Sequence, residues 1–237
     1  MEYNNYVKKV IKDNYSLRNL VQKYSAAFPE LFYDENPSED VCLEAVKVDG
    51  KLLGLIEHQT EKLCLTAVRQ NGLALQDVEH QTSEICIAAV KQCGWALEYV
   101  EHQTPEICIA AVKQFGFALH FVEDQNPEIC LAAVKKDGLV LQYVEDQTPK
   151  ICLAAVKQLW QALQYVKHQT TEICLAAVKN SGYALQAVER QTLDICLEAV
   201  KQDEEVLKFV KPEFKEACKK EIERLKSKQY LKYADTF

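Results

Sequence analysis

The sequence lacks apolar runs of the length that a membrane-spanning helix needs. The longest such runs in its repeated part, for example residues 107–112, are only six residues, whereas a bilayer crossing takes roughly 18–20. The first residues, MEYNNYVKKVIKDNYS, also contain no uninterrupted apolar segment of signal-peptide length. Both absences predict a soluble protein of a reducing compartment, for which we expect the cytoplasm, and no membrane partner.

An excess of positive charge is lacking as well. The chain has 28 basic and 35 acidic residues, a formal charge of −7 at pH 7, which is the wrong sign for attraction to nucleic-acid phosphates. This balance disfavours a nucleic-acid-binding solenoid. The 48% content of hydrophobic residues excludes a disordered chain.

What the sequence does contain is an internal repeat. Eight units of 22 residues tile residues 35–210 without an insertion, and the clearest unit is EHQTPEICIAAVKQFGFALHFV at 101–122. We number positions 1 to 22 within each unit, from Glu101 in this copy. A period of this length indicates a solenoid, in which stacked units bury the faces that one unit cannot bury alone. Residues that share a position should therefore form rows.

Each unit predicts two helices. Position 4 is Ser, Thr or Asn in every unit, and these residues cap helix N-termini. Glycine at position 16 in six units predicts a left-handed cap at the end of a helix of about ten residues. A shorter second helix follows. In the copy at 101–122 the first helix is apolar at six successive positions, 107–112, which predicts that it is enclosed on most sides. Helix-forming residues dominate, which argues against a β-solenoid, and the leucine-rich-repeat signature is absent.

The sequence therefore predicts an all-α fold, an α-solenoid of eight 22-residue helix-turn-helix repeats with N- and C-terminal helical caps. We expect the N-terminal cap at 1–34, the repeats at 35–210 and a charged C-terminal cap at 211–237, all in one elongated domain. Solenoids need polar terminal caps because the ends of their cores are otherwise open.

Nine of the ten cysteines occur 22 residues apart, at Cys42, Cys64, Cys86, Cys108, Cys130, Cys152, Cys174, Cys196 and Cys218. Stacked helices lie roughly 8–10 Å apart, which is too far for a disulfide, and one thiol per layer cannot surround a zinc ion. We therefore expect free thiols packed in the core as small apolar side chains. Cys93 lies off this spacing, so we expect it to be exposed, and a reactive role for it stays open.

We expect the other polar rows to have structural roles or to be exposed to solvent. Four units carry histidine at position 2 (His58, His80, His102 and His168), where others carry Asp or Arg, so we expect a solvated row and no metal site. Glutamine at position 3 of seven units should bond the backbone between units or form a ladder. The basic row at position 13 should pair with the acidic row at position 1.

No nucleophile–base pair, carboxylate dyad or phosphate-binding loop stands out from the repeat. We therefore expect no enzyme activity, no catalytic residue and no cofactor. 

Position 17 forms an apolar row on an otherwise polar face: Leu73, Trp95, Phe117, Leu139 and Tyr183. The row could belong to the glycine cap, by packing on position 12, and the polar Gln161 and Glu205 in the two units without that glycine favour this reading. It could also contact a partner. Trp160 replaces the turn glycine, so either the first helix continues there or an exposed tryptophan marks an interaction site. The candidate protein-binding surface is Trp95, Phe115, Phe117, His120, Trp160 and Tyr183.

The motif PEICLAAVKQxGxALQYV, best seen at 127–144 and 171–188, resembles the LAAVKQNGLALQYV-type helical repeat family, a domain of unknown function. That family is abundant in giant DNA viruses of amoebae and occurs in some amoeba-associated bacteria. Many of its members have more variable spacing than the strict 22 residues found here. The resemblance covers 35–210 and implies a helical repeat module of viral origin, with no chemistry to assign to any residue.

We therefore expect a non-enzymatic repeat scaffold that mediates protein–protein interaction and acts on a viral or host protein in the host cytoplasm. The alternative is a structural or self-assembling component of the virus particle, which would form homo-oligomers. A nucleic-acid-binding solenoid ranks third.

Overall fold

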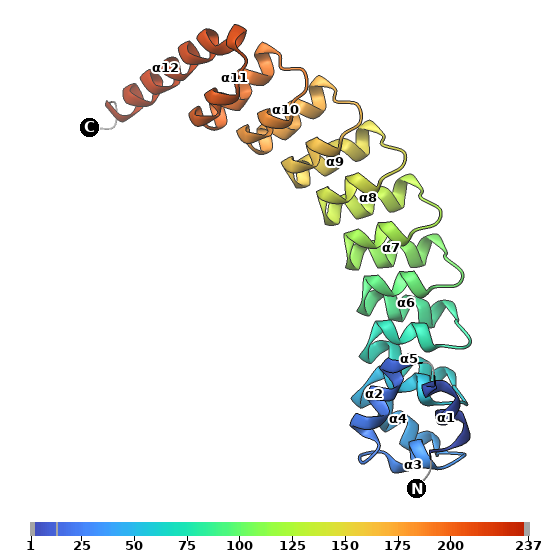
Figure 1. Cartoon of the computed structure of the whole chain (residues 1–237). Helices are drawn as coiled ribbons and strands as arrows, with labels where there is room; N and C mark the ends of the chain where they lie inside the picture. Colours follow the sequence, from blue (N-terminus) through green and yellow to red (C-terminus); the bar gives the residue numbers. More distant parts are fainter. Residues whose placement is uncertain (1–2, 13, 235–237) are drawn as a thin grey trace. The chain divides into compact units, whose positions relative to one another are not determined.

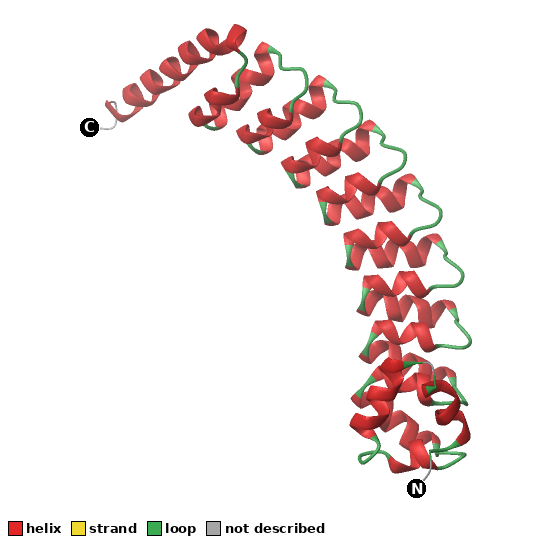
Figure 2. Ribbon diagram, in the orientation of Figure 1, coloured by secondary structure: helices red, strands yellow, loops and turns green. Residues whose placement is uncertain are grey.

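The computed structural model describes residues 3–12 and 14–234. Residues 1–2, 13 and 235–237, which belong to the two predicted caps, lie outside the described residues. The described chain is built of helices and turns with no strand, as Figures 1 and 2 show, which confirms the all-α solenoid. It divides into two compact units, Met1–Asp124 and Gln125–Phe237, which we call unit 1 and unit 2 and describe separately. The predicted domain boundaries stay predictions.

Short 3₁₀ helices, labelled η, alternate with α-helices from α4 onwards in unit 1 and throughout unit 2. Unit 1 contains α1 (Asn5–Ile11), α2 (Tyr15–Tyr24), α3 (Pro29–Tyr33), α4 (Glu39–Val48), η1 (Gly50–Leu55), α5 (Glu61–Gln70), η2 (Gly72–Asp77), α6 (Ser83–Gln92), η3 (Gly94–Tyr99), α7 (Pro105–Gln114) and η4 (Gly116–Phe121). Unit 2 contains α8 (Pro127–Lys136), η5 (Gly138–Tyr143), α9 (Pro149–Gln158), η6 (Trp160–Tyr165), α10 (Thr171–Asn180), η7 (Gly182–Ala187), α11 (Leu193–Gln202), η8 (Glu204–Phe209) and α12 (Pro212–Ala234).

The helix starts follow the capping residues. The side chain at position 4 accepts a hydrogen bond from the backbone N–H at position 7, for example from Ile107 to Thr104 and from Ile129 to Asn126. The α-helix ends at position 14 in each repeat, and α9 ends at Gln158 like its neighbours. The α-helix therefore does not continue through Trp160, so one of the two explanations for that residue is wrong.

The second helix of each repeat is a 3₁₀ helix over positions 16–21. Where position 15 is Asp or Asn, its side chain can accept from the backbone N–H of position 17, as Asn71 does from Leu73. Side chains three residues apart eclipse one another in a 3₁₀ helix. Positions 17 and 20 therefore lie on the same side of each short helix.

The predicted left-handed glycine cap is wrong. No glycine among the described residues has a positive φ, so the glycine at position 16 is needed for a different reason. A Cβ on Gly72 would lie 2.4 Å from the carbonyl oxygen of Ala89, and one on Gly94 would lie 2.9 Å from that of Ala111. The next α-helix thus approaches the glycine too closely for a side chain. Without the left-handed cap, the capping explanation of the position 17 row is wrong as well.

The core recurs in every repeat. In the copy at 101–122, Ile107, Ala111 and Val112 are at most 1% exposed, and burial of a side chain the size of Ile107 or Val112 contributes about 1.5–3 kcal/mol. Positions 9 and 10, here Ile109 and Ala110, are only half-buried. The prediction that the α-helix is enclosed on most sides is therefore wrong for these two positions.

Glutamine side chains join successive repeats. Gln103 donates from Nε2 to the carbonyl oxygen of Phe121 (2.7 Å), and its Oε1 accepts from the N–H of Glu123 (3.1 Å) and the thiol of Cys108 (3.4 Å). The same three bonds recur at Gln59, Gln81, Gln125, Gln147, Gln169 and Gln191. This confirms that the row bonds the backbone between repeats.

Candidate protein-binding surface

Five aromatic side chains gather on the 3₁₀ side of unit 1. We call Trp95, Phe115, Phe117, His120 and Phe121 the aromatic cluster. The indole of Trp95 stacks on Phe115 with ring centroids 5.1 Å apart and meets Phe121 edge to face at 5.4 Å. Phe117 lies 5.7 Å from Phe115, and His120 meets Phe121 at 5.3 Å. Two successive repeats therefore supply one surface, since Trp95 comes from η3 and the rest from the following copy.

Trp95 is 47% exposed although both its ring contacts are made. Such ring pairs add about 0.5–1.5 kcal/mol each beyond burial, so they hold the indole in one orientation. Glu98, also exposed, lies three residues further along η3 and therefore on the same side as Trp95. A large aromatic side chain held at a surface is typical of an interaction hot spot.

The remaining two predicted surface residues belong to unit 2. The Tyr183 hydroxyl donates to the carboxylate of Glu205 (3.1 Å), and this hydrogen bond raises the pKa of the Tyr183 hydroxyl. Lys208 Nζ lies 5.7 Å from the Tyr183 ring centroid and 5.0 Å from that of Phe209. Trp160 opens η6 and is half-buried.

The structure thus places Trp95, Phe115, Phe117 and His120 in one cluster, and it puts Trp160 and Tyr183 in the other unit. Sequence reasoning missed Phe121. Its signal was available, because position 21 adjoins position 20 and carries an aromatic ring in several repeats, including Tyr99 and Phe209.

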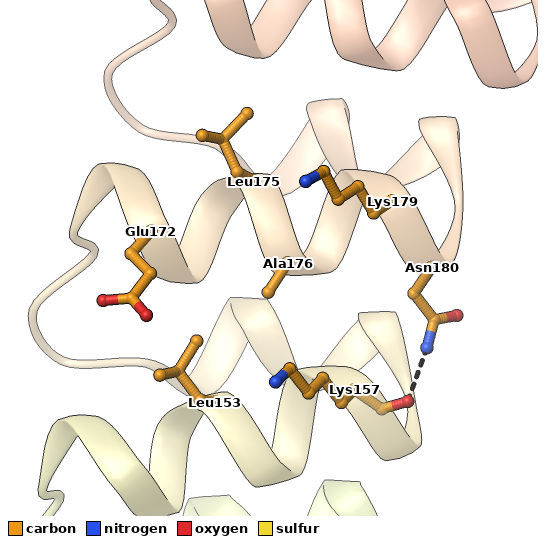
Figure 3. A pocket seen from close by; sticks show the side chains of 7 residues that line it. All are labelled: Leu153, Lys157, Glu172, Leu175, Ala176, Lys179 and Asn180. Atoms are coloured by element: carbon orange, nitrogen blue, oxygen red, sulfur yellow. Dashed lines mark hydrogen bonds between the residues drawn. The ribbon is translucent and has the colours of Figure 1, made fainter.

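A groove runs between α9 and α10 in unit 2, with a volume of about 470 Å³. Figure 3 shows Leu153, Leu175 and Ala176 along it, with Glu172 towards one end. Lys157 and Lys179 lie towards the other end, where Asn180 donates to the carbonyl oxygen of Lys157 at 2.7 Å. The groove offers an apolar floor, two ammonium groups and one carboxylate. Its floor is built from positions 9 and 10, which the sequence pattern assigned to the core.

The ion pairs differ from those predicted. Among the described residues, the basic row at position 13 makes its ion pairs with positions 6 and 10, and none with position 1. Arg69 pairs with Glu84 of the next repeat at 3.7 Å, and Lys201 pairs with Glu198 of its own helix at 3.7 Å. The side chains of Arg69 and Glu84 are exposed, so their pair contributes about 0–1 kcal/mol.

The nine thiols of the cysteine row are in an environment that lowers their reactivity. All ten cysteines lie within the described residues and are free thiols, and the nine in the row are buried. Burial raises the pKa of each of the nine thiols, to about 11 for Cys196. A buried thiol with a raised pKa is a poor nucleophile. Cys93 is half-buried, so the expectation that it is exposed is only partly met.

The histidine row at position 2 is exposed in all four units that carry it, which confirms the surface prediction. Across residues 3–12 and 14–234, no group of three or more His, Cys, Asp or Glu side chains is placed to hold a metal ion. No helix in the same residues is long and apolar enough to cross a membrane.

Comparison with known families gives one match, to the family described as Domain of unknown function (DUF4116), over residues 60–104, 82–126, 104–148 and 170–215. Each matched segment begins at position 4, the helix cap, and covers two of the 22-residue repeats. Comparisons with curated proteins and with solved structures found no match. Because the matched segments cover more than half of the chain, it belongs to the family described as Domain of unknown function (DUF4116).

Proposed function

We propose that this protein is a non-enzymatic scaffold that binds another protein through the aromatic cluster of unit 1. The observation that carries the proposal is the 47% exposure of Trp95 while its ring is held by Phe115 and Phe121. A pre-oriented aromatic side chain loses little conformational freedom on binding, and its desolvation supplies affinity.

The repeated rows support the scaffold role because most of them already serve the stack. Gln103 and its equivalents bond neighbouring repeats, and the glycine row allows close approach of the helices. The thiol row is buried, which supports the absence of cysteine chemistry. The residues at positions 17, 20 and 21 vary between repeats at the surface. A partner could recognise a particular repeat by these side chains.

The resemblance to repeats of giant DNA viruses supports a more specific proposal. On that basis, the protein is viral, acts in the host cytoplasm and binds a viral or host protein. Its partner is a protein and its role does not require a cofactor.

The proposal is tested by affinity capture from infected-cell extracts with wild-type protein and the Trp95→Ala/Phe117→Ala variant. Circular dichroism first establishes that the variant keeps its helicity. We expect the variant to lose partners that the wild-type protein retains, while a Leu139→Ala/Gln161→Ala control, at the same positions of unit 2, keeps them. Identical sets of captured proteins from all three would remove the cluster as the binding surface.

Self-assembly into a particle is distinguished by size-exclusion chromatography with light scattering. Oligomers that form with rising concentration and disappear in the Trp95→Ala/Phe117→Ala variant would assign the aromatic cluster to contacts between copies of this chain.

A further inference from the structure

We infer that the aromatic cluster receives a cationic side chain, arginine or lysine, from the bound protein. The inference rests on the proposed function for the location of the surface and adds the chemistry of the partner. Three observations lead to it: an equivalent site in unit 2 that already holds a cation, the carboxylate beside Trp95, and the charge of unit 1.

Unit 2 contains the equivalent site with a cation in place. Tyr183 occupies position 17 and Phe209 occupies position 21 of the next repeat, and their rings meet edge to face at 6.1 Å with an interplanar angle of 63°. The ammonium group of Lys208, at position 20, lies over both rings. A cation within about 6 Å of an aromatic face is attracted by the ring quadrupole.

Trp95 and Phe121 hold the same two positions in unit 1. Their rings meet edge to face at 5.4 Å and 61°, close to the arrangement in unit 2. Position 20 is His120 here, and its ring packs against the edge of Phe121. Among the described residues, no lysine or arginine side chain lies over Trp95 or Phe121. In unit 2 the ring pair holds the ammonium group of Lys208. In unit 1 the equivalent ring pair, Trp95 and Phe121, holds no such cation from the described residues.

The residues around Trp95 and Phe121 favour binding of a cation supplied by a partner protein. Tryptophan is the best of the aromatic side chains for cation–π contact. Glu98 lies on the same side of η3 and is exposed, so its carboxylate can pair with an ammonium or guanidinium beside the indole. Residues 1–124 include 11 basic and 19 acidic residues, a formal charge of −8, against 17 basic and 16 acidic in residues 125–237. The negative electrostatic potential that results from this charge attracts a cationic partner to unit 1.

The test uses a synthetic peptide of alternating glycine and arginine, and a second peptide in which neutral citrulline replaces each arginine. The chain has only two tryptophans, so Trp160→Phe leaves Trp95 as the single indole reporter. We expect a saturable change in Trp95 fluorescence with the arginine peptide and roughly tenfold weaker binding of the citrulline peptide at low ionic strength.

Variants distinguish binding of the peptide at Trp95 and Glu98 from its general attraction to the negative charge of unit 1. Trp95→Leu introduces the residue found at this position in two other repeats, Leu73 and Leu139, so the fold should be kept. Binding of a fluorescein-labelled arginine peptide, followed by anisotropy, should weaken roughly three- to tenfold in Trp95→Leu and in Glu98→Gln. The matched control is Glu106→Gln, which removes one exposed carboxylate from α7 of the same unit and should change binding less than twofold, roughly the limit of diffuse charge effects.

Equal binding of the two peptides, or an equal loss in Glu98→Gln and Glu106→Gln, would overturn the inference. If the arginine peptide fails but the Trp95→Ala/Phe117→Ala variant still loses its captured proteins, the scaffold proposal stands and only the cationic chemistry is wrong. If neither changes, both are wrong.

Discussion

The side chain of Gln92 accepts a hydrogen bond from the backbone N–H of Gly72, with Oε1 and N 2.6 Å apart. The same glycine has no space for a Cβ, since the carbonyl oxygen of Ala89 would lie 2.4 Å from it. Glycine at position 16 and glutamine at position 14 of the next repeat are thus two halves of one contact. The same bond joins Gly50 to Gln70, Gly94 to Gln114 and Gly138 to Gln158.

Replacing Gly72 by alanine should therefore destabilise unit 1. Replacing a glycine of negative φ by alanine ordinarily stabilises a protein, by about 0.4–1 kcal/mol. A destabilised Gly72→Ala variant would therefore indicate that the new Cβ has no space. We expect a loss of about 1–3 kcal/mol, because the α6 backbone must move away, measured by urea unfolding followed by circular dichroism. Gly54→Ala serves as the comparison, since its new Cβ would meet side-chain atoms of Asp77 and Leu17, which can move. A Gly72→Ala variant as stable as the wild-type protein would contradict the close-contact explanation.

Gln103→Glu tests the glutamine row with nearly the same shape. A carboxylate cannot donate to the Phe121 carbonyl oxygen, so at pH 7 we expect a loss of about 1–3 kcal/mol in the free energy of unfolding. Because the donor returns when the carboxyl is protonated, the deficit relative to wild type should shrink towards pH 4. Gln164→Glu, at an exposed position of η6, is the control and should change stability by less than about 0.5 kcal/mol. A deficit that is independent of pH would count against the hydrogen bond as its cause.

Thiol labelling should distinguish Cys93 from the nine cysteines of the row. Treatment of the native protein with iodoacetamide at neutral pH should modify Cys93 first, because that thiol alone is not buried. In denaturant, all ten thiols should react. Mass spectrometry of the intact protein counts the adducts. Rapid labelling of several thiols under native conditions would mean that the row is not buried in solution.

Alkaline pH should weaken the fold through the thiol of Cys196. Burial and the adjacent Cys218 thiol raise the pKa of Cys196 from the ordinary 9.0 to about 11. The folded state keeps the proton longer than the unfolded state does, so the stability contribution is complete below pH 9 and falls as the pH rises towards 11. The slope is about 1.4 kcal/mol per pH unit for one thiol. Cys196→Ala should reduce the slope of stability against pH above 9 by this amount and leave the slope below pH 8 unchanged. An unaltered slope above pH 9 would contradict the assignment.

Much of the fold could be predicted from sequence because its determinants are local and repeated. The Thr104 cap and the 22-residue spacing of Cys108 and its equivalents were enough to define the first helix and its buried side. The role of Gly72 could not be predicted, because close approach of a neighbouring backbone and a left-handed turn both select glycine. The 3₁₀ form of the second helix was missed for a similar reason, since six residues provide too few turns to distinguish one helical period from another.

The candidate site was predicted in part. Trp95, Phe115, Phe117 and His120 stood out as residues that break the repeat pattern, and they do meet. Phe121 was missed although position 21 carries an aromatic ring in several repeats, including Tyr99 and Phe209. The groove at Leu175 was missed because a half-buried leucine and a core leucine look alike in a sequence.

The account is tested most directly by the two indole N–H resonances of the wild-type protein in a ¹⁵N-correlated NMR spectrum, assigned with the Trp160→Phe variant. On addition of the alternating glycine–arginine peptide, we predict that the Trp95 indole resonance moves in a saturable way while the Trp160 resonance stays in place. A shift of Trp160 alone, an equal shift of both resonances, or no shift of either would contradict recognition of a cationic side chain at the aromatic cluster.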